Sequence, residues 1–188
     1  MSVVAPAALR AIRRAVAGGG IRIVAVDGPS GAGKSTFARA LAAAWPSARP
    51  VLVRLDDAYP GWHGLERGAD AVRRGLVAPI ARDAVGVLAR WDWAGDRPGP
   101  RQGVRPGHPL IVEGCGAFAA TDRLPALRVW VHAPDDVRKA AALGRDAGAF
   151  DPYWEVWDRQ WRRHTARTRP DRAADLRVSG VREVRPNP

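Results

Sequence analysis

The sequence contains a single cysteine, four histidines and no long apolar run, and each scarcity excludes a class of protein. Cys115 alone cannot form a disulfide within the chain or a zinc site built from cysteines, so we expect a small buried residue in a cytoplasmic protein. The histidines form no cluster with metal-ligand spacing. Arginines, glycines and prolines interrupt every apolar stretch before it reaches the length of a membrane span, which argues against a membrane partner.

Lysine is also scarce, because Lys34 and Lys139 are the only two among 30 basic residues. The net charge of +11 would attract nucleic acid. However, the arginines are scattered among alanine, glycine and proline and form no basic stripe. We interpret them as solvated side chains with a smaller set that faces phosphate, so nucleic acid is an alternative partner and not the expected one.

The length of 188 residues suits one α/β domain over residues 1–188 and is too short for two domains and a linker. We expect a leading helix within residues 1–20. Residues 182–188 contain two prolines and no apolar periodicity, and they predict a loose tail. Residues 95–109 are rich in glycine, proline and arginine, which indicates an exposed loop.

Short apolar runs with β-strand character alternate with segments of helical character. The runs are residues 21–26, 51–55, 110–112 and 128–131. Such alternation predicts a three-layer α/β/α fold with a mainly parallel central sheet, and it predicts that ligands bind at the carboxyl ends of the strands.

Residues 28–35 read Gly-Pro-Ser-Gly-Ala-Gly-Lys-Ser, the full G-x-x-x-x-G-K-[ST] phosphate-binding loop (Walker A), directly after the first apolar run. Glycines let successive backbone N–H groups point at phosphate oxygens, and the start of the following helix adds a positive dipole. Lys34 would reach the β and γ phosphates of ATP, and Ser35 would offer its hydroxyl to Mg²⁺. The expected nucleotide-binding residues are Gly28, Ser30, Gly31, Ala32, Gly33, Lys34, Ser35 and Thr36.

Carboxylates follow the second and third apolar runs. Asp56 and Asp57 could accept a proton from a hydroxyl that attacks the γ phosphate, or one of them could orient Mg²⁺ through water; the alternative is helix capping or turn formation. Glu113 ends a strand expected beside the first, where it could hold Mg²⁺; the alternative is a salt bridge. The expected metal site is therefore Ser35, Glu113 and Asp56.

Several ordered motifs together resemble those of the uridine kinase branch of the P-loop kinases, whose wider circle includes phosphoribulokinase and bacterial pantothenate kinase. The matching pieces are residues 28–35, 56–59 (Asp-Asp-Ala-Tyr), 90–93 (Arg-Trp-Asp-Trp), 112–114 (Val-Glu-Gly), 145–146 (Arg-Asp) and 174–178 (Ala-Asp-Leu-Arg-Val). The resemblance implies a P-loop NTPase fold with a short helical lid and the use of ATP and Mg²⁺. It also implies phosphoryl transfer to an acceptor hydroxyl, most simply the 5′ hydroxyl of a nucleoside, and a homo-oligomer.

The resemblance also implies roles for single residues. Aligning Tyr59 with the tyrosine of the family makes Asp56 the catalytic aspartate, while another register would choose Asp57. Trp91 takes the place of the tyrosine that the family sets against the nucleoside base, with Asp92 beside it. The acceptor-binding residues would be Asp57, Tyr59, Trp91 and Asp92.

Arginine suits the charge that develops on a phosphoryl group in transfer. Arg145 occupies the place of a lid arginine, and Arg138 is a second candidate that could equally be a solvated face residue. Trp154, Trp157 and Trp161 form one stripe at helical spacing, which is typical of core packing and could also line the acceptor pocket.

The chain departs from the family pattern at the acceptor. The family reads the pyrimidine with a histidine and an arginine shortly after the tyrosine motif, whereas residues 94–97 contain no histidine. Asp70 and His63 are stand-ins for the ribose contacts of the family. Two alternatives therefore stay open: a kinase of a nucleoside monophosphate or a non-nucleotide metabolite, and an ATP-binding regulatory module with a basic nucleic-acid-binding surface.

Overall fold

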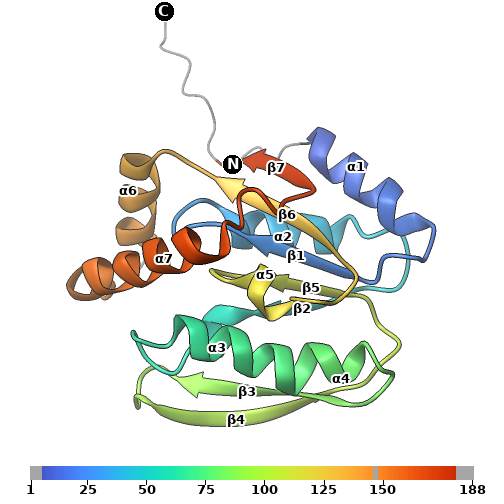
Figure 1. The fold of residues 1–188 in the computed structure, drawn as a ribbon, viewed down its shortest axis with the longest axis horizontal. Helices are drawn as coiled ribbons and strands as arrows, with labels where there is room; N and C mark the ends of the chain where they lie inside the picture. Colours follow the sequence, from blue (N-terminus) through green and yellow to red (C-terminus); the bar gives the residue numbers. More distant parts are fainter. Residues whose placement is uncertain (1–5, 146–147, 181–188) are drawn as a thin grey trace, which may run out of the picture.

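The computed structural model describes residues 6–145 and 148–180, and its centre is a five-stranded parallel sheet (Figure 1). In spatial order the strands are β2 (Val51–Arg54), β5 (Leu110–Glu113), β1 (Ile23–Asp27), β6 (Ala126–His132) and β7 (Leu176–Ser179). Four of these strands match the predicted apolar runs to within three residues at each end. The phosphate-binding loop thus leaves the middle strand of the sheet.

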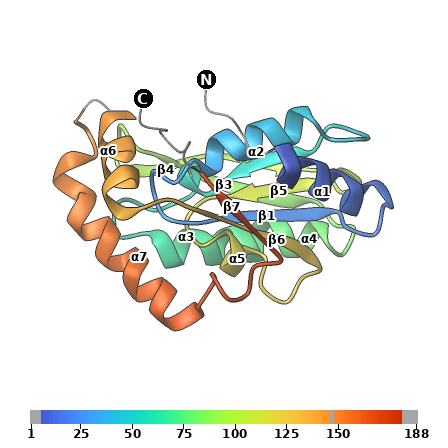
Figure 2. The ribbon, with the colours of Figure 1, turned by 90° about the horizontal axis from the view of Figure 1, so that it is seen from above.

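Helices cover both faces of the sheet (Figures 1 and 2). One face carries α1 (Pro6–Ala17) and α2 (Lys34–Ala43), and the other carries α3 (Leu65–Val72), α4 (Ala78–Ile80), α5 (Ala117–Ala120) and α7 (Trp154–Thr168). Helix α6 (Asp135–Arg145) follows β6, and the short turns are η1 (Leu55–Asp57), the π-helical η2 (Arg73–Val77) and η3 (Asp151–Tyr153). The predicted three-layer α/β/α arrangement is confirmed.

Strand β1 is buried on both of its faces. Val24 and Val26 pack into one hydrophobic core with α1 and α2, whereas Ile23 and Ala25 pack into the other core with α3, α5 and α7. Successive side chains of a strand point to opposite faces, so a strand covered on both sides is a continuous apolar run. This explains why the strand at residues 21–26 could be predicted from the sequence.

The prediction of an irregular loop at residues 95–109 is wrong. Most of this segment is β4 (Arg97–Val104), which pairs antiparallel with β3 (Gly86–Asp92) in a separate two-stranded sheet. The expectation of exposure holds, because most β4 side chains face solvent. A strand with two prolines and two glycines carries no apolar alternation, and proline is tolerated there because it lies at a sheet edge.

The ends of the chain are only partly described. Helix α1 lies within the expected leading helix, while the predicted tail at residues 182–188 and Asp146 of the predicted lid motif lie outside the described residues. Within residues 6–145 and 148–180, no helix has both the length and the apolar character needed to cross a membrane.

Candidate active site

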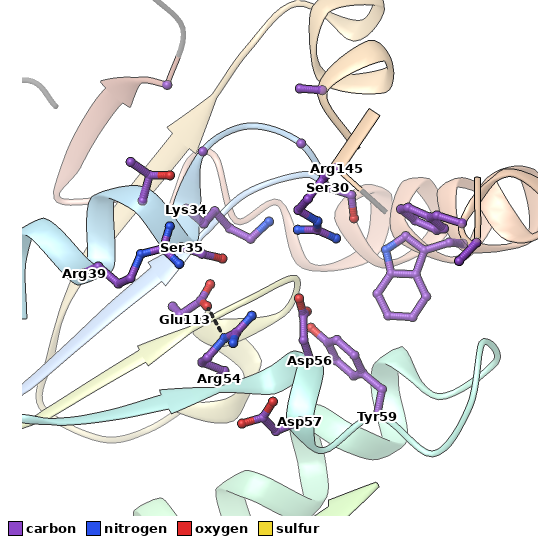
Figure 3. Close-up of a pocket in the computed structure, with 18 of the residues that line it drawn as sticks. Ser30, Lys34, Ser35, Arg39, Arg54, Asp56, Asp57, Tyr59, Glu113 and Arg145 are labelled. Carbon is purple, nitrogen blue, oxygen red and sulfur yellow. Dashed lines mark ion pairs between the residues drawn. The ribbon is translucent and has the colours of Figure 1, made fainter. Parts of the chain in front are cut away.

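A cavity of about 1110 Å³ lies at the carboxyl ends of β1, β2 and β5 (Figure 3). Its walls come from the phosphate-binding loop, α2, η1, α6 and the first part of α7. Most residues singled out from the sequence line it: Ser30, Gly31, Gly33, Lys34, Ser35, Thr36, Asp56, Asp57, Tyr59, Glu113 and Arg145. The structure thus brings into one cavity residues that are far apart in the sequence, from Ser30 to Arg145.

Four of the residues expected from the sequence to bind a ligand do not line this cavity. Gly28 and Ala32 are buried within the phosphate-binding loop and do not line the cavity. Trp91 and Asp92 also lie outside its lining, because they belong to β3 and pair there with Pro98 and Arg97 of β4. The residue that reaches the cavity is Trp93, which follows the end of β3. From this segment the tryptophan that lines the cavity is therefore Trp93, two residues after the expected Trp91.

The two stand-ins for ribose contacts are likewise distant from the cavity lining. Asp70 forms ion pairs with Arg73 and Arg74, at 2.8 and 2.9 Å, and His63 is exposed. Neither residue is positioned to read a sugar in this cavity.

The phosphate-binding loop is pressed against the first turn of α6. A Cβ atom on Gly31 would stand 1.8 Å from the carbonyl oxygen of Arg138, and Gly31 has a φ of +79°, so only glycine fits. Gly33 is left-handed and is followed at once by α2. The unpaired N–H groups of the first turn of α2 thus border the cavity, which is a favourable site for phosphate.

Lys34 is held inside this loop. Its Nζ atom donates a hydrogen bond to the carbonyl oxygen of Pro29 at 2.9 Å and lies 3.6 Å from the Sγ atom of Cys115. Burial acts to lower the pKa of Lys34, but Cys115 and the carboxylates of Glu113 and Asp56 outweigh it, so the pKa is raised. The side chain therefore presents a positive charge to the cavity.

Glu113 fits the role of a magnesium ligand. It is 1% exposed, burial and the nearby Asp56 raise its pKa, and its Oε1 atom lies 3.4 Å from Nε of Arg54 without accepting a hydrogen bond from any described residue. Ser35 acts in the opposite direction on this pKa, and both expected ligands line the same cavity. A buried carboxylate is costly without a cation beside it. Arg54 supplies one here, which is the salt bridge considered as the alternative for Glu113, and Mg²⁺ would be a second cation at the same carboxylate.

The described residues contain no group of three His, Cys, Asp or Glu side chains placed to hold a metal ion. A magnesium ion in a nucleotide site needs no such group, because one or two protein oxygens are joined by phosphate oxygens and water. Ser35 and Glu113 supply such a partial set, and they are the residues that would hold Mg²⁺.

Replacing Glu113 with glutamine should raise the Mg²⁺ concentration needed for half-maximal activity by about tenfold or more, because a buried anionic ligand is lost. A magnesium titration of ADP release at saturating ATP would measure this. Arg54→Gln is the matched control, since it removes the partner of Glu113 and leaves the carboxylate; an unchanged titration in the Glu113 variant would contradict the assignment.

The two neighbouring aspartates point in different directions. In Figure 3 the carboxylate of Asp56 is directed toward Lys34 and Ser30, whereas that of Asp57 points to the side below Arg54. Asp56 also influences the pKa of both Lys34 and Glu113. This orientation supports Asp56 as the base and leaves Asp57 at the border of the cavity.

The end of the cavity beyond Asp56 is walled by aromatic side chains. We call this set the aromatic box, and it consists of Tyr59, Trp62, Trp93, Phe150 and Trp157. In Figure 3 Tyr59 lies on the far side of Asp56 from Arg39 and Ser35. The cavity therefore has a phosphate end and an aromatic end, with Asp56 between them.

Helix α6 contributes one arginine to the cavity and uses the other for packing. Arg145 lines the cavity near Ser30 (Figure 3). Arg138 is 3% exposed, lies 2.7 Å from Asp135 and 2.8 Å from Asp158, and its guanidinium lies 5.3 Å from the centre of the Trp154 ring. Arg138 thus joins α6 to α7, and of these two α6 arginines Arg145 is the one that lines the cavity.

Sequence reasoning missed several lining residues. Trp62, Phe150, Arg39 and Arg54 carry no motif, and Trp93 was noted only as the end of one. The tryptophan stripe did give a signal: Trp154, Trp157 and Trp161 are each 5% exposed and lie in the core, as expected, and one of them also lines the cavity.

Comparison with known proteins bears on the fold. No family model matches the chain, and no curated protein matches it in sequence. The chain is similar in structure to a "possible uridine kinase" from Bacillus stearothermophilus, with a TM-score of 0.60, 15% sequence identity and coverage of 90% of this chain and 96% of that one. It is also similar to a "putative fructose transport system kinase" from a Silicibacter species, with a TM-score of 0.54, 21% identity and coverage of 90% and 98%. The chain thus shares its α/β fold with these two solved structures.

Proposed function

We propose that the protein is a kinase that uses ATP and Mg²⁺ to phosphorylate a hydroxyl group of a small molecule, with a nucleoside as the first candidate acceptor. The observation that carries this proposal is the position of Asp56, between a phosphate-binding loop and an aromatic box within one cavity. A nucleotide switch would need the loop alone, whereas a kinase needs a second compartment for the acceptor and a base at the junction.

The chemistry follows from this arrangement. The acceptor hydroxyl oxygen bonds to the γ phosphorus, the bond from that phosphorus to the β–γ bridging oxygen breaks, ADP leaves, and the hydroxyl proton passes to Asp56. Lys34 and Arg145 are the cations that would stabilise the charge on the transferred group. When bound by Ser35 and Glu113, Mg²⁺ supplies neutralisation of phosphate charge.

A sugar is the second candidate acceptor. Among the described lining residues, none is a histidine that could read a pyrimidine, and the structural neighbour from Silicibacter is named for fructose transport. Both candidates use the same phosphate end of the cavity and differ only in what fills the aromatic box.

The test is ADP release from ATP and Mg²⁺ in the presence of nucleosides, nucleoside monophosphates and sugars, including fructose. Stimulation by at least one acceptor is the expected result. If ATP binds and no acceptor changes the rate, while polynucleotides bind in a salt-dependent way, the proposal is wrong and the protein is a regulatory module.

A further inference from the structure

The layer formed by α1 and α2 carries charge of almost one sign. Between residues 6 and 55 the chain contains eight arginine and lysine residues and one acidic residue. That acid is Asp27, which is fully buried at the end of β1 and accepts hydrogen bonds from backbone N–H groups. All other acidic residues of the chain follow residue 55. The α1–α2 layer therefore contains no exposed carboxylate to balance its cations.

Six arginines of this layer are exposed and form no ion pair with any residue that the structure describes. They are Arg10, Arg13 and Arg14 of α1, Arg22 before β1, Arg39 of α2 and Arg49 before β2. Elsewhere in the fold, arginines do find carboxylates, as Arg74 does with Asp70 and Arg162 with Asp158. The guanidinium groups of the α1–α2 layer thus keep their charge and their N–H donors for an anion from outside.

Helix α1 turns its arginines away from the sheet. Ile12 and Val16 are buried in the core between α1, α2 and the sheet. At about 100° per residue, Arg10, Arg13 and Arg14 lie on the opposite side of the helix. Arg10 and Arg14 are four positions apart, a spacing at which like charges repel and destabilise a helix. An anionic partner bound across this face would relieve that repulsion.

The backbone beside these arginines is open. Gly18, Gly19 and Gly20 follow α1 and are exposed, and a Cβ atom at any of the three would have no heavy atom within 4 Å. A backbone without side chains lets a large partner approach closely. The segment between Arg14 and Arg22 therefore places no bulk in front of a partner that contacts both.

The side chains of the layer favour a nucleic acid over a membrane. A helix that binds a membrane surface buries apolar side chains in lipid. The apolar residues of α1 already pack against the sheet, and the large exposed apolar side chains that the structure describes, Val85, Trp93 and Tyr153, lie on other elements. Arginine forks match phosphate oxygens, and such contacts hold a nucleic acid without reading its bases.

We propose that the α1–α2 layer binds the phosphate backbone of a nucleic acid, with Arg10, Arg13 and Arg14 as the main contacts. The fold places on one face (Figures 1 and 2) arginines that are scattered in the sequence. Of the six exposed arginines only Arg39 lines the cavity, so this surface is distinct from the candidate active site. The binding is additional to the proposed kinase function and does not depend on it.

The deciding experiment measures the binding of a fluorescein-labelled DNA duplex of about 24 base pairs by anisotropy, in NaCl from about 50 to 300 mM. We expect a Kd of about 10⁻⁶ M or lower at the lowest salt concentration. The slope of log K against log [NaCl] should be about −3 to −5, since each neutralised phosphate contributes about −0.9. A duplex of unrelated sequence should bind within about twofold, because backbone contacts carry no sequence information.

Two triple variants remove the same charge from opposite parts of the molecule. The first combines Arg10→Gln, Arg13→Gln and Arg14→Gln. The control combines three exposed arginines that form no ion pair with a described residue and lie in or near α4 and β4: Arg82→Gln, Arg101→Gln and Arg105→Gln. The α1 variant should weaken binding at about 50 mM NaCl by about tenfold or more and reduce the slope by about 2 to 3, whereas the control should lose less than about threefold. Unchanged ATP affinity would show that both variants are folded.

Three outcomes would overturn the inference. Equal losses in the two triple variants would show that net charge, and not the α1–α2 layer, accounts for binding. Absence of duplex binding at about 50 mM NaCl would reject the surface outright. Binding to phosphatidylserine vesicles without binding to the duplex would assign the layer to a membrane. ADP release with an acceptor tests the kinase proposal separately, so either proposal can fail alone.

Discussion

The Asp56→Asn variant should turn over about 10²–10⁴-fold more slowly than the wild type, with the dissociation constant for ATP unchanged. Asparagine has nearly the same shape as aspartate but cannot accept the hydroxyl proton. The backbone carbonyl of residue 56, which accepts the hydrogen bond from Trp93, stays in place. The expected loss therefore falls on kcat, and pre-steady-state measurement of ADP formation with a competent acceptor would report it.

Asp57→Asn is the control for this prediction. Its carboxylate points away from Lys34 in Figure 3, so turnover should fall by less than about tenfold. If Asp56→Asn and Asp57→Asn lose the same activity, the directions of the two carboxylates do not identify which aspartate is the base. If Asp56→Asn loses ATP affinity and turnover in equal measure, Asp56 is a nucleotide ligand and not the base.

The Asp27→Ala variant should lose about 3–5 kcal/mol of the free energy of unfolding, which can unfold a domain of ordinary stability. The Asp27 side chain is fully buried at the end of β1. It accepts hydrogen bonds from the backbone N–H groups of Gly28, Gly116 and Phe118 at 2.7, 2.9 and 2.9 Å. Alanine would leave three buried N–H groups without partners, and these groups hold the phosphate-binding loop to the start of α5.

Urea unfolding followed by tryptophan fluorescence would measure this loss, with two comparison variants. Asp27→Asn keeps one accepting oxygen and should lose less than Asp27→Ala. Asp122→Ala removes a carboxylate that is 60% exposed and should stay within about 0.5 kcal/mol of the wild type. A midpoint for Asp27→Ala equal to that of Asp122→Ala would show that the three contacts contribute nothing net.

The parallel sheet and the phosphate end of the site were legible in the sequence because their signals are local. A strand buried on both faces is a continuous apolar run, and the phosphate-binding loop needs its glycines and Lys34 at fixed spacing. Asp56 and Glu113 followed from one further rule, that ligands bind where parallel strands end. These predictions needed no knowledge of how distant segments pack.

The aromatic end could not be predicted in the same way. Trp62, Trp93 and Phe150 lie in irregular segments, where no periodicity marks a side chain as facing a ligand. The motif alignment chose Trp91, but β3 ends at Asp92, and the chain then turns so that Trp93 reaches back to the carbonyl of Asp56. That contact depends on the β3–β4 hairpin, which itself lacked an apolar pattern.

Helix α6 is anchored to α7 at its first turn, and its last residue lines the cavity. Arg138 ties the first turn to Asp135, to Asp158 of α7 and to the ring of Trp154. Arg145 stands seven residues further on, an arm of about 10 Å at the rise of an α-helix. A small tilt at the root becomes a larger displacement at the arginine. A substitution at Asp158 would therefore alter the position of Arg145 without changing a residue that lines the cavity.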